Sequence, residues 1–179
     1  MSKFETNPHR ILTHMPPLLS ATGISKAFPG VQALKDVDLH IQPGELLAVG
    51  SRKYKCSDPA GDADAAATLG KLADLAAPFG VRVALYPHAG SWVERVEDAV
   101  RVAKKVDRKN IGATFNLCHF LQVDSQKNLE AALKAAAPSL FAVTISGADN
   151  DAKGWDKLIQ TLDRGTFDVT RVLRTLKEA

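Results

Sequence analysis

The chain has few aromatic residues, few cysteines and no long apolar run. Aromatic residues make up 6% of its 179 residues, and the two cysteines, Cys56 and Cys118, match no metal-binding or redox spacing. Charged residues interrupt the apolar runs well short of the ~18 residues that a membrane-spanning helix needs. Residues 1–17 lack the apolar core of a secretory signal. These absences exclude a disulfide scaffold and a membrane span, and they predict a cytoplasmic protein.

The charge balance gives little support to a nucleic-acid partner. There are 23 basic and 20 acidic residues, a net charge of +3, and no basic run is interleaved with aromatic residues. The hydrophobic share of 45% and the charged share of 24% are typical of an ordinary soluble domain. We therefore expect a globular protein that does not bind nucleic acid.

The first fifty residues have a β-like pattern. Apolar residues fall close to every second position over residues 34–41, and Pro43-Gly44 and a short apolar run at residues 45–49 follow them. This pattern predicts antiparallel strands joined by a Pro-Gly turn. The predicted organisation is a flexible N-terminus over residues 1–16, a β-strand segment over 17–50, a linker over 51–59 and a second domain over 60–179.

The second domain alternates between β-like and helical patterns. Three apolar runs, residues 81–86, 111–117 and 140–146, recur at about the length of one βαβ unit, with amphipathic stretches between them. A helix over residues 65–77 precedes the first run, and Gly80 suits the left-handed position after its end. This order predicts an α/β fold, a partial (β/α) TIM-barrel-like parallel sheet with helices, preceded by the short antiparallel β segment. Three strands fill less than half of an eight-stranded barrel.

Residues 23–45, which read GISKAFPGVQALKDVDLHIQPGE, resemble the start of the ATP-binding subunit of a sugar ABC transporter. In that family an aromatic residue at the position of Phe28 stacks on adenine, so the resemblance implies a nucleotide-binding role for Phe28. The phosphate-binding loop should follow Gly50, but Lys55 stands where its second glycine is expected and Cys56 where its lysine is expected. We therefore expect no ATP hydrolysis and no bound ATP.

Residues 58–179 resemble the sugar phosphate isomerase/epimerase group of the xylose-isomerase-like TIM barrel superfamily. The segments that carry the resemblance are VALYPH at residues 83–88, WVER at 92–95, GATFNLCH at 112–119, GWDKLI at 154–159 and LDRGTFDV at 162–169. The resemblance implies an isomerase of carbohydrate metabolism whose partner is a small sugar or sugar phosphate.

The resemblance also implies a divalent metal held by Glu, Asp, His and Glu at the ends of four strands, which polarises an open-chain sugar. Tyr86 takes the place of the first glutamate and Asn116 that of the aspartate, while residues 143–146 offer no histidine. The last glutamate would lie beyond residue 179. Two histidines at strand ends, His88 and His119, remain as weak ligands for Mn or Zn.

The candidate site follows from these strand ends. His88 and His119 are the predicted catalytic residues, and Asn116, Trp92 and Glu94 are the predicted substrate-binding residues. The alternative is structural in each case: a loop position for His88, a backbone bond for His119, packing for Trp92 and compensation of the helix dipole for Glu94.

Three further side chains near the strand ends are weaker candidates for a catalytic role. If the second strand continues through residue 119, Cys118 and His119 point to opposite faces, which disfavours a thiol mechanism. Asp149 and Asp151 could each supply a carboxylate, but Asn150-Asp151 is equally typical of a turn.

Three functions therefore remain open. The chain is a sugar isomerase/epimerase-like protein with impaired or no turnover, an ATP-binding fragment of a sugar transporter, or a non-catalytic fusion remnant. The unlike halves favour a chimeric and truncated chain, and self-association could complete its sheet.

Overall fold

The computed structural model describes residues 19–28, 31–41 and 47–179. Contacts divide the chain into two units, residues 1–45 and 46–179. The predictions for residues 1–16 and for the side chain of Phe28 lie outside the residues and side chains described. The nucleotide-binding role of Phe28 therefore stays a prediction.

The first unit contains an antiparallel pair of strands, β1 (Leu19–Phe28) and β2 (Val31–Ile41). Their register shifts between Ala21 and Ile24, where Gly23 adopts a left-handed conformation with φ 64°. The prediction of an antiparallel β segment is confirmed, but one of the strands expected in it lies elsewhere. The run at residues 45–49 was expected to join this segment, whereas β3 (Leu47–Ala48) pairs in parallel with a strand of the second unit.

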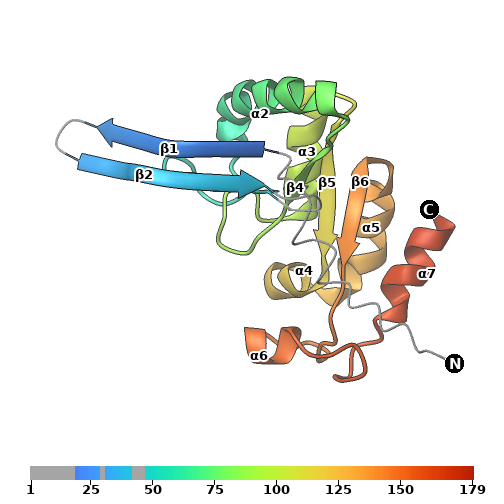
Figure 1. The fold of residues 1–179 in the computed structure, drawn as a ribbon. Helices are drawn as coiled ribbons and strands as arrows, with labels where there is room; N and C mark the ends of the chain where they lie inside the picture. The colour runs from blue at the N-terminus through green and yellow to red at the C-terminus, as the bar shows by residue number, and fades with distance from the viewer. Residues whose placement is uncertain (1–18, 29–30, 42–46) are drawn as a thin grey trace, which may run out of the picture. The chain divides into compact units, whose positions relative to one another are not determined.

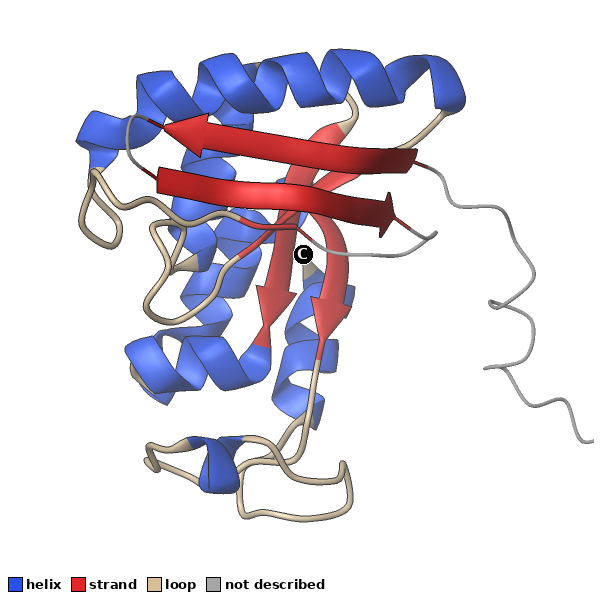
Figure 2. Cartoon of the chain, turned by 60° about the vertical axis from the view of Figure 1, so that its left-hand side comes forward, coloured by secondary structure: helices blue, strands red, loops and turns tan. Residues whose placement is uncertain are grey.

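The second unit is built on a four-stranded parallel sheet of order β3-β4-β5-β6 (Figure 1). Its three longer strands are β4 (Val83–Tyr86), β5 (Ile111–Asn116) and β6 (Leu140–Thr144). In both ribbon views β5 and β6 run side by side in the same direction (Figures 1 and 2). The prediction of an α/β, partial TIM-barrel-like fold is confirmed, and β3 is the strand that the sequence pattern missed.

Helices connect the parallel strands. The longer ones are α2 (Asp62–Ala76), α3 (Val96–Val106), α4 (Leu117–Val123), α5 (Leu129–Ala136), α6 (Trp155–Leu158) and α7 (Thr170–Glu178). Single 3-10 turns lie at η1 (Pro59–Gly61), η2 (Ala77–Phe79), η3 (Gln126–Asn128) and η4 (Ala137–Ser139). Helix α3 packs on β4 and β5, with α2 and α5 beside it. No helix in the described part of the chain is long and apolar enough to cross a membrane.

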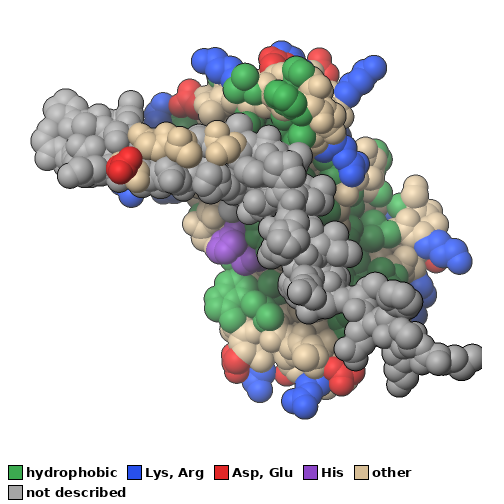
Figure 3. Space-filling view, viewed as in Figure 1, with side chains coloured by type: hydrophobic (Ala, Val, Ile, Leu, Met, Phe, Trp, Pro, Cys, Tyr) green, Lys and Arg blue, Asp and Glu red, His purple; other side chains and the backbone are tan. Residues whose placement is uncertain are grey.

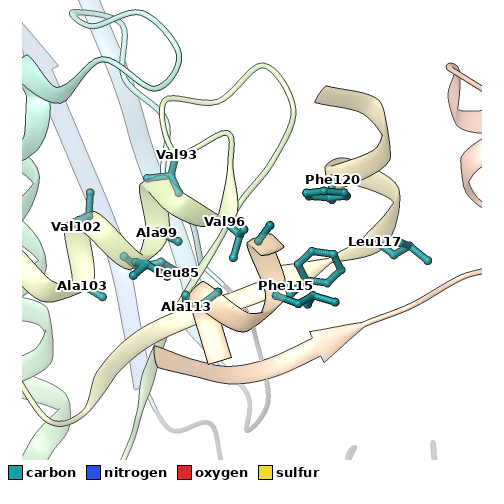
Figure 4. Packing of buried hydrophobic residues seen from close by; sticks show 14 of the residues in the cluster. Leu85, Val93, Val96, Ala99, Val102, Ala103, Ala113, Phe115, Leu117 and Phe120 are labelled. Atoms are coloured by element: carbon teal, nitrogen blue, oxygen red, sulfur yellow. The ribbon is translucent and has the colours of Figure 1, made fainter. Parts of the chain in front are cut away.

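The core lies between α3 and the central strands. Leu85 of β4 and Phe115 of β5 are fully buried and lie close to Val96 and Ala99 of α3 (Figure 4). Five consecutive residues of β5 are buried on both faces, as expected for a central strand of a parallel sheet. Helix α3 is therefore one of the amphipathic stretches predicted between the apolar runs, and it buries its apolar face on the sheet.

The segment predicted as a linker packs against the second unit. The ring of Tyr54 lies 6.5 Å from the ring of Trp92, and the backbone N–H of Ser57 donates to the carbonyl of Trp92 at 2.9 Å. The indole N–H of Trp92 donates to the carbonyl of Asp58 at 2.8 Å. Residues 51–59 are thus held by the α/β unit.

One predicted boundary is wrong at the site. The strand was expected to continue to residue 117 and beyond, but β5 ends at Asn116 and α4 begins at the next residue. Asn116 causes this change because its side-chain oxygen accepts the backbone N–H of His119 at 3.1 Å and caps the helix. Cys118 and His119 therefore lie in the first turn of a helix, and the argument from alternating strand faces does not apply to them.

Candidate functional site

A chain of hydrogen bonds joins the carboxyl ends of the three longer strands. The side-chain N–H₂ of Asn116 donates to the hydroxyl of Tyr86 at 2.6 Å and to the hydroxyl of Thr144 at 2.7 Å. Tyr86 is the last residue of β4, Asn116 of β5 and Thr144 of β6. Asn116 is directly opposite Thr144 in the sheet register. The carboxyl edge of a parallel sheet is where α/β proteins place their functional groups.

Asn116 is a positioning residue in this arrangement. Both of its side-chain N–H groups are used by Tyr86 and Thr144, and its oxygen accepts from the thiol of Cys118 at 2.9 Å as well as from the His119 backbone. An amide has no further N–H to offer. In this geometry Asn116 fixes the strand ends and the start of α4, and its role in substrate binding stays a prediction.

The two predicted catalytic histidines lie in contact. Their ring centroids are 4.1 Å apart, at an interplanar angle of 41°. His119 is 7% exposed, and its ring stands edge-on to Tyr86 at 5.5 Å and to Trp155 at 5.0 Å. In the space-filling view, histidine reaches the surface beside hydrophobic side chains (Figure 3). Both histidines follow neighbouring strands, His88 two residues after β4 and His119 in the first turn of α4, and their catalytic role stays a prediction.

Burial controls the charge of His119. Loss of hydration, with a smaller contribution from His88, lowers the pKa of His119 to about 4. Its Nδ1 atom accepts the backbone N–H of Ala89 at 3.2 Å. His119 is therefore a neutral imidazole at neutral pH.

This lowered pKa makes stability depend on pH. The unfolded chain binds a proton at His119 below its ordinary pKa of 6.5, whereas the folded chain binds it only near pH 4. Unfolding is therefore favoured as the pH falls, and His119 should cost about 2 kcal/mol of stability between pH 7.5 and pH 5. Urea unfolding of the wild type and of His119→Asn, which still offers an acceptor to Ala89, measures this. The two pH profiles should diverge below pH 6.5, and parallel profiles would contradict the lowered pKa.

Trp92 and Glu94 lie apart from this hydrogen-bonded cluster. Trp92 is 3% exposed and packs on Tyr54, as the structural alternative predicts. A carboxylate oxygen of Glu94 accepts the backbone N–H of Gly90 at 2.9 Å and so closes the loop after β4. The residue that caps α3 is Asp98, whose carboxylate accepts the backbone N–H of Arg95 at 2.9 Å.

Cys118 is poorly suited to nucleophilic chemistry. It is buried, burial raises the pKa of its thiol, and the thiol donates to Asn116. The acidic residues after β6 are also engaged. A carboxylate oxygen of Asp149 accepts the backbone N–H of Thr166 at 3.2 Å, and Asp151 has the left-handed backbone (φ 53°) of a turn residue.

Trp155 is the site residue that the sequence analysis missed. It begins α6, which lies beyond the carboxyl ends of β5 and β6 in both ribbon views (Figures 1 and 2), and it is 43% exposed. The ammonium group of Lys153 donates to the carbonyls of Gln122 and Asp124, at 3.0 and 3.1 Å, and anchors this segment on the end of α4. The sequence Gly154-Trp155 at the start of a short helix was the only hint in the sequence. The contact between Trp155 and His119 forms only in the folded chain.

The side chains present do not fit the four-ligand metal centre that the resemblance implies. In the described ranges, no three His, Cys, Asp or Glu side chains come together as a metal-binding group. Tyr86 and Asn116 hydrogen-bond to each other, and the Nδ1 atom of His119 is occupied by Ala89. Of the nitrogens expected to bind a metal, only Nε2 of His88 is left with a free lone pair, and one nitrogen does not make a centre.

A parallel sheet with its polar groups at the carboxyl edge defines this protein as one of the α/β class. The chain belongs to the xylose isomerase-like TIM barrel family, whose sequence profile matches residues 24–179.

Curated relatives include two inosose isomerases. The protein from Bacillus velezensis is 30% identical over 117 residues, which are 63% of this chain and 41% of that protein. The protein from Bacillus subtilis is 29% identical over 114 residues, or 62% and 40% of the two chains. The chain thus matches about two fifths of the length of these relatives.

Solved structures share the fold. The IOLI protein, crystallised with a bound zinc atom, has a TM-score of 0.54 and 25% identity, and the match covers 65% of this chain and 43% of that one. D-allulose 3-epimerase from Methylomonas sp. has a TM-score of 0.55 and 18% identity, with 73% and 42% covered. At that identity, the second likeness concerns the fold alone.

Proposed function

We propose that this chain is a sugar isomerase/epimerase-like protein that binds a small keto-sugar or cyclic keto-polyol at the carboxyl edge of β4–β6, with little or no turnover of its own. The observation that carries the proposal is the contact between His88 and His119 beside the half-exposed ring of Trp155. The inosose isomerase relatives favour a polyhydroxylated ring carrying a ketone as the ligand.

The chemistry of the side chains suits such a ligand. One face of a sugar or inositol ring carries C–H groups, which pack on an aromatic surface such as the exposed part of Trp155. The hydroxyl and carbonyl oxygens of the ligand need directional partners, and a pair of imidazoles can supply both donors and acceptors. A few convergent polar groups on an apolar, aromatic wall are typical of small-molecule sites.

Low turnover follows from the missing carboxylates. Isomerisation moves a proton between neighbouring carbons and needs stabilisation of the oxyanion that forms. Tyr86 and Asn116 stand where the family resemblance implies acidic ligands, and both are hydrogen-bonded to each other. His88 could accept a proton, but no charged group among the described site residues is placed to stabilise the oxyanion.

Binding should depend on the histidine pair. Replacing both His88 and His119 by alanine removes every imidazole donor and acceptor from the site, and we expect inosose binding to fall about 30- to 1,000-fold, since each of the two lost polar contacts costs roughly 1–2 kcal/mol. Isothermal titration with inosose and with D-fructose measures the change. Lys71→Ala, on the exposed side of α2, is the matched control. Unchanged binding in the double variant would refute the site.

Thermal melts of the same protein samples distinguish this proposal from the two other candidate functions. A ligand that binds the native state raises the melting temperature. Stabilisation by inosose but not by Mg-ATP supports the proposal, whereas stabilisation by Mg-ATP alone supports the transporter alternative. A melt that no ligand shifts supports a fusion remnant.

A further inference from the structure

The backbone of Ala89, the residue after His88, hydrogen-bonds to both imidazoles. The carbonyl oxygen of Ala89 is 2.9 Å from Nδ1 of His88, and the N–H of the same residue is 3.2 Å from Nδ1 of His119. One residue therefore offers an acceptor to the first ring and a donor to the second.

These two bonds fix which nitrogen of each ring carries the proton. A carbonyl oxygen only accepts hydrogen bonds, so Nδ1 of His88 must carry a proton, and in the neutral form of that ring Nε2 has a free lone pair. A backbone N–H only donates, so Nδ1 of His119 must be unprotonated and its proton must sit on Nε2. Burial keeps His119 neutral, because it lowers the pKa to about 4.

Both Nε2 atoms are available to a ligand. Among the residues that the structure describes, neither atom has a hydrogen-bond partner, and neither belongs to the buried polar atoms that lack one. Because the ring centroids are only 4.1 Å apart, one small molecule can reach both atoms.

We infer that the backbone N–H and C=O of Ala89 hold His88 and His119 in opposite tautomers and so select a ligand with a hydroxyl next to a carbonyl. The hydroxyl donates to Nε2 of His88, and the carbonyl oxygen accepts from the Nε2–H of His119. This inference rests on the proposed function for the ligand, but the tautomers themselves are a property of the free protein. Ala89 is a positioning residue, and it acts through its backbone alone.

The tautomers can be measured without a ligand. Long-range ¹H–¹⁵N NMR of ¹⁵N-histidine-labelled protein at pH 8 distinguishes a protonated ring nitrogen from an unprotonated one. We expect the Nδ1–H form for His88, which free histidine populates less, and the Nε2–H form for His119. The variants His88→Asn and His119→Asn assign the signals by their disappearance. The same tautomer at both positions, or averaged signals, would overturn the inference.

The same two variants separate ligand contact from structure. At position 88 an asparagine can still donate to the Ala89 carbonyl, and at position 119 it can still accept the Ala89 N–H, so each keeps the local bond and loses the Nε2 function. We expect each to weaken inosose binding at least about 10-fold, which corresponds to one lost hydrogen bond. Wild-type affinity in both variants would show that the imidazoles are structural, and would overturn the inference.

Failure of the inference and failure of the proposed function are distinguishable. Opposite tautomers in a protein that binds no inosose would leave the tautomer assignment standing and overturn the proposed function. Inosose binding by a protein with identical tautomers would do the reverse.

Discussion

Replacing Asp98 by alanine should lower the free energy of unfolding by about 3–5 kcal/mol, because several hydrogen bonds to a buried carboxylate are lost at once. Asp98 is 2% exposed, and its carboxylate accepts from Arg101 at 2.6 Å, from the hydroxyl of Ser57 at 2.5 Å and from the backbone of Arg95 at 2.9 Å. The change leaves Arg101 without this partner, uncaps α3 and releases the segment that contains Ser57. Urea unfolding followed by circular dichroism measures the loss.

A second Asp–Arg pair provides the control. The carboxylate of Asp74 accepts from Arg108 at 2.7 Å, but the two side chains are 57% and 46% exposed. Water screens such a pair, and Asp74→Ala should change stability little. An equal loss of unfolding free energy in the two variants would show that burial of the hydrogen bonds of Asp98 contributes nothing to stability.

Periodicity was enough to predict the parallel sheet. The apolar runs of the three longer strands stand out in the sequence, and β4, β5 and β6 begin within two residues of the predicted positions. Gly80 takes the left-handed conformation, with φ 67°, at the end of the 3-10 turn that follows α2, because no Cβ opposes it there.

The missed elements depend on distant residues. The two residues of β3 are too few to show a period, and their position is set by pairing with β4 and by the bond from the Val93 N–H to the carbonyl of Val49 at 3.1 Å. The start of α4 depends on the cap at Asn116, whose N–H₂ group is held by two other strands. A single sequence gives no sign of such contacts, and so strand ends at the site were the least predictable part.

The site itself was partly predictable for the same reason. Parallel strands bring their carboxyl ends to one edge, so the order of the apolar runs is sufficient to place His88 near His119. What the pattern could not show was the environment of each side chain. Trp92 is buried by residues from the predicted linker, whereas Trp155 reaches His119 from a loop that follows a strand not adjacent to β4.

Gly165 should be essential for the segment that carries Trp155. Its backbone is left-handed, with φ 90°, and a Cβ at this position would overlap the carbonyl of Ala148, which is fully buried. That carbonyl also accepts the N–H of Phe167 at 2.9 Å, so it cannot move aside without losing the bond. Gly165→Ala should therefore lower stability by more than the roughly 1–2 kcal/mol of left-handed strain alone.

The Gly165→Ala substitution should also weaken ligand binding. The bridge between Gly147 and Gln160 closes a loop that contains Trp155, whose ring contacts His119, and the bond from the Phe167 N–H to the Ala148 carbonyl holds the residues around Gly165 against the start of this loop. If Gly165→Ala opens the loop, inosose binding should fall at least about 10-fold, because the aromatic wall leaves the site while the sheet and the histidines stay. Gly80→Ala is the matched control, since φ is also positive there but a Cβ would meet open space. It should cost only the left-handed strain and leave binding unchanged. Equal effects of the two substitutions on binding would show that the Trp155 loop does not form part of the site.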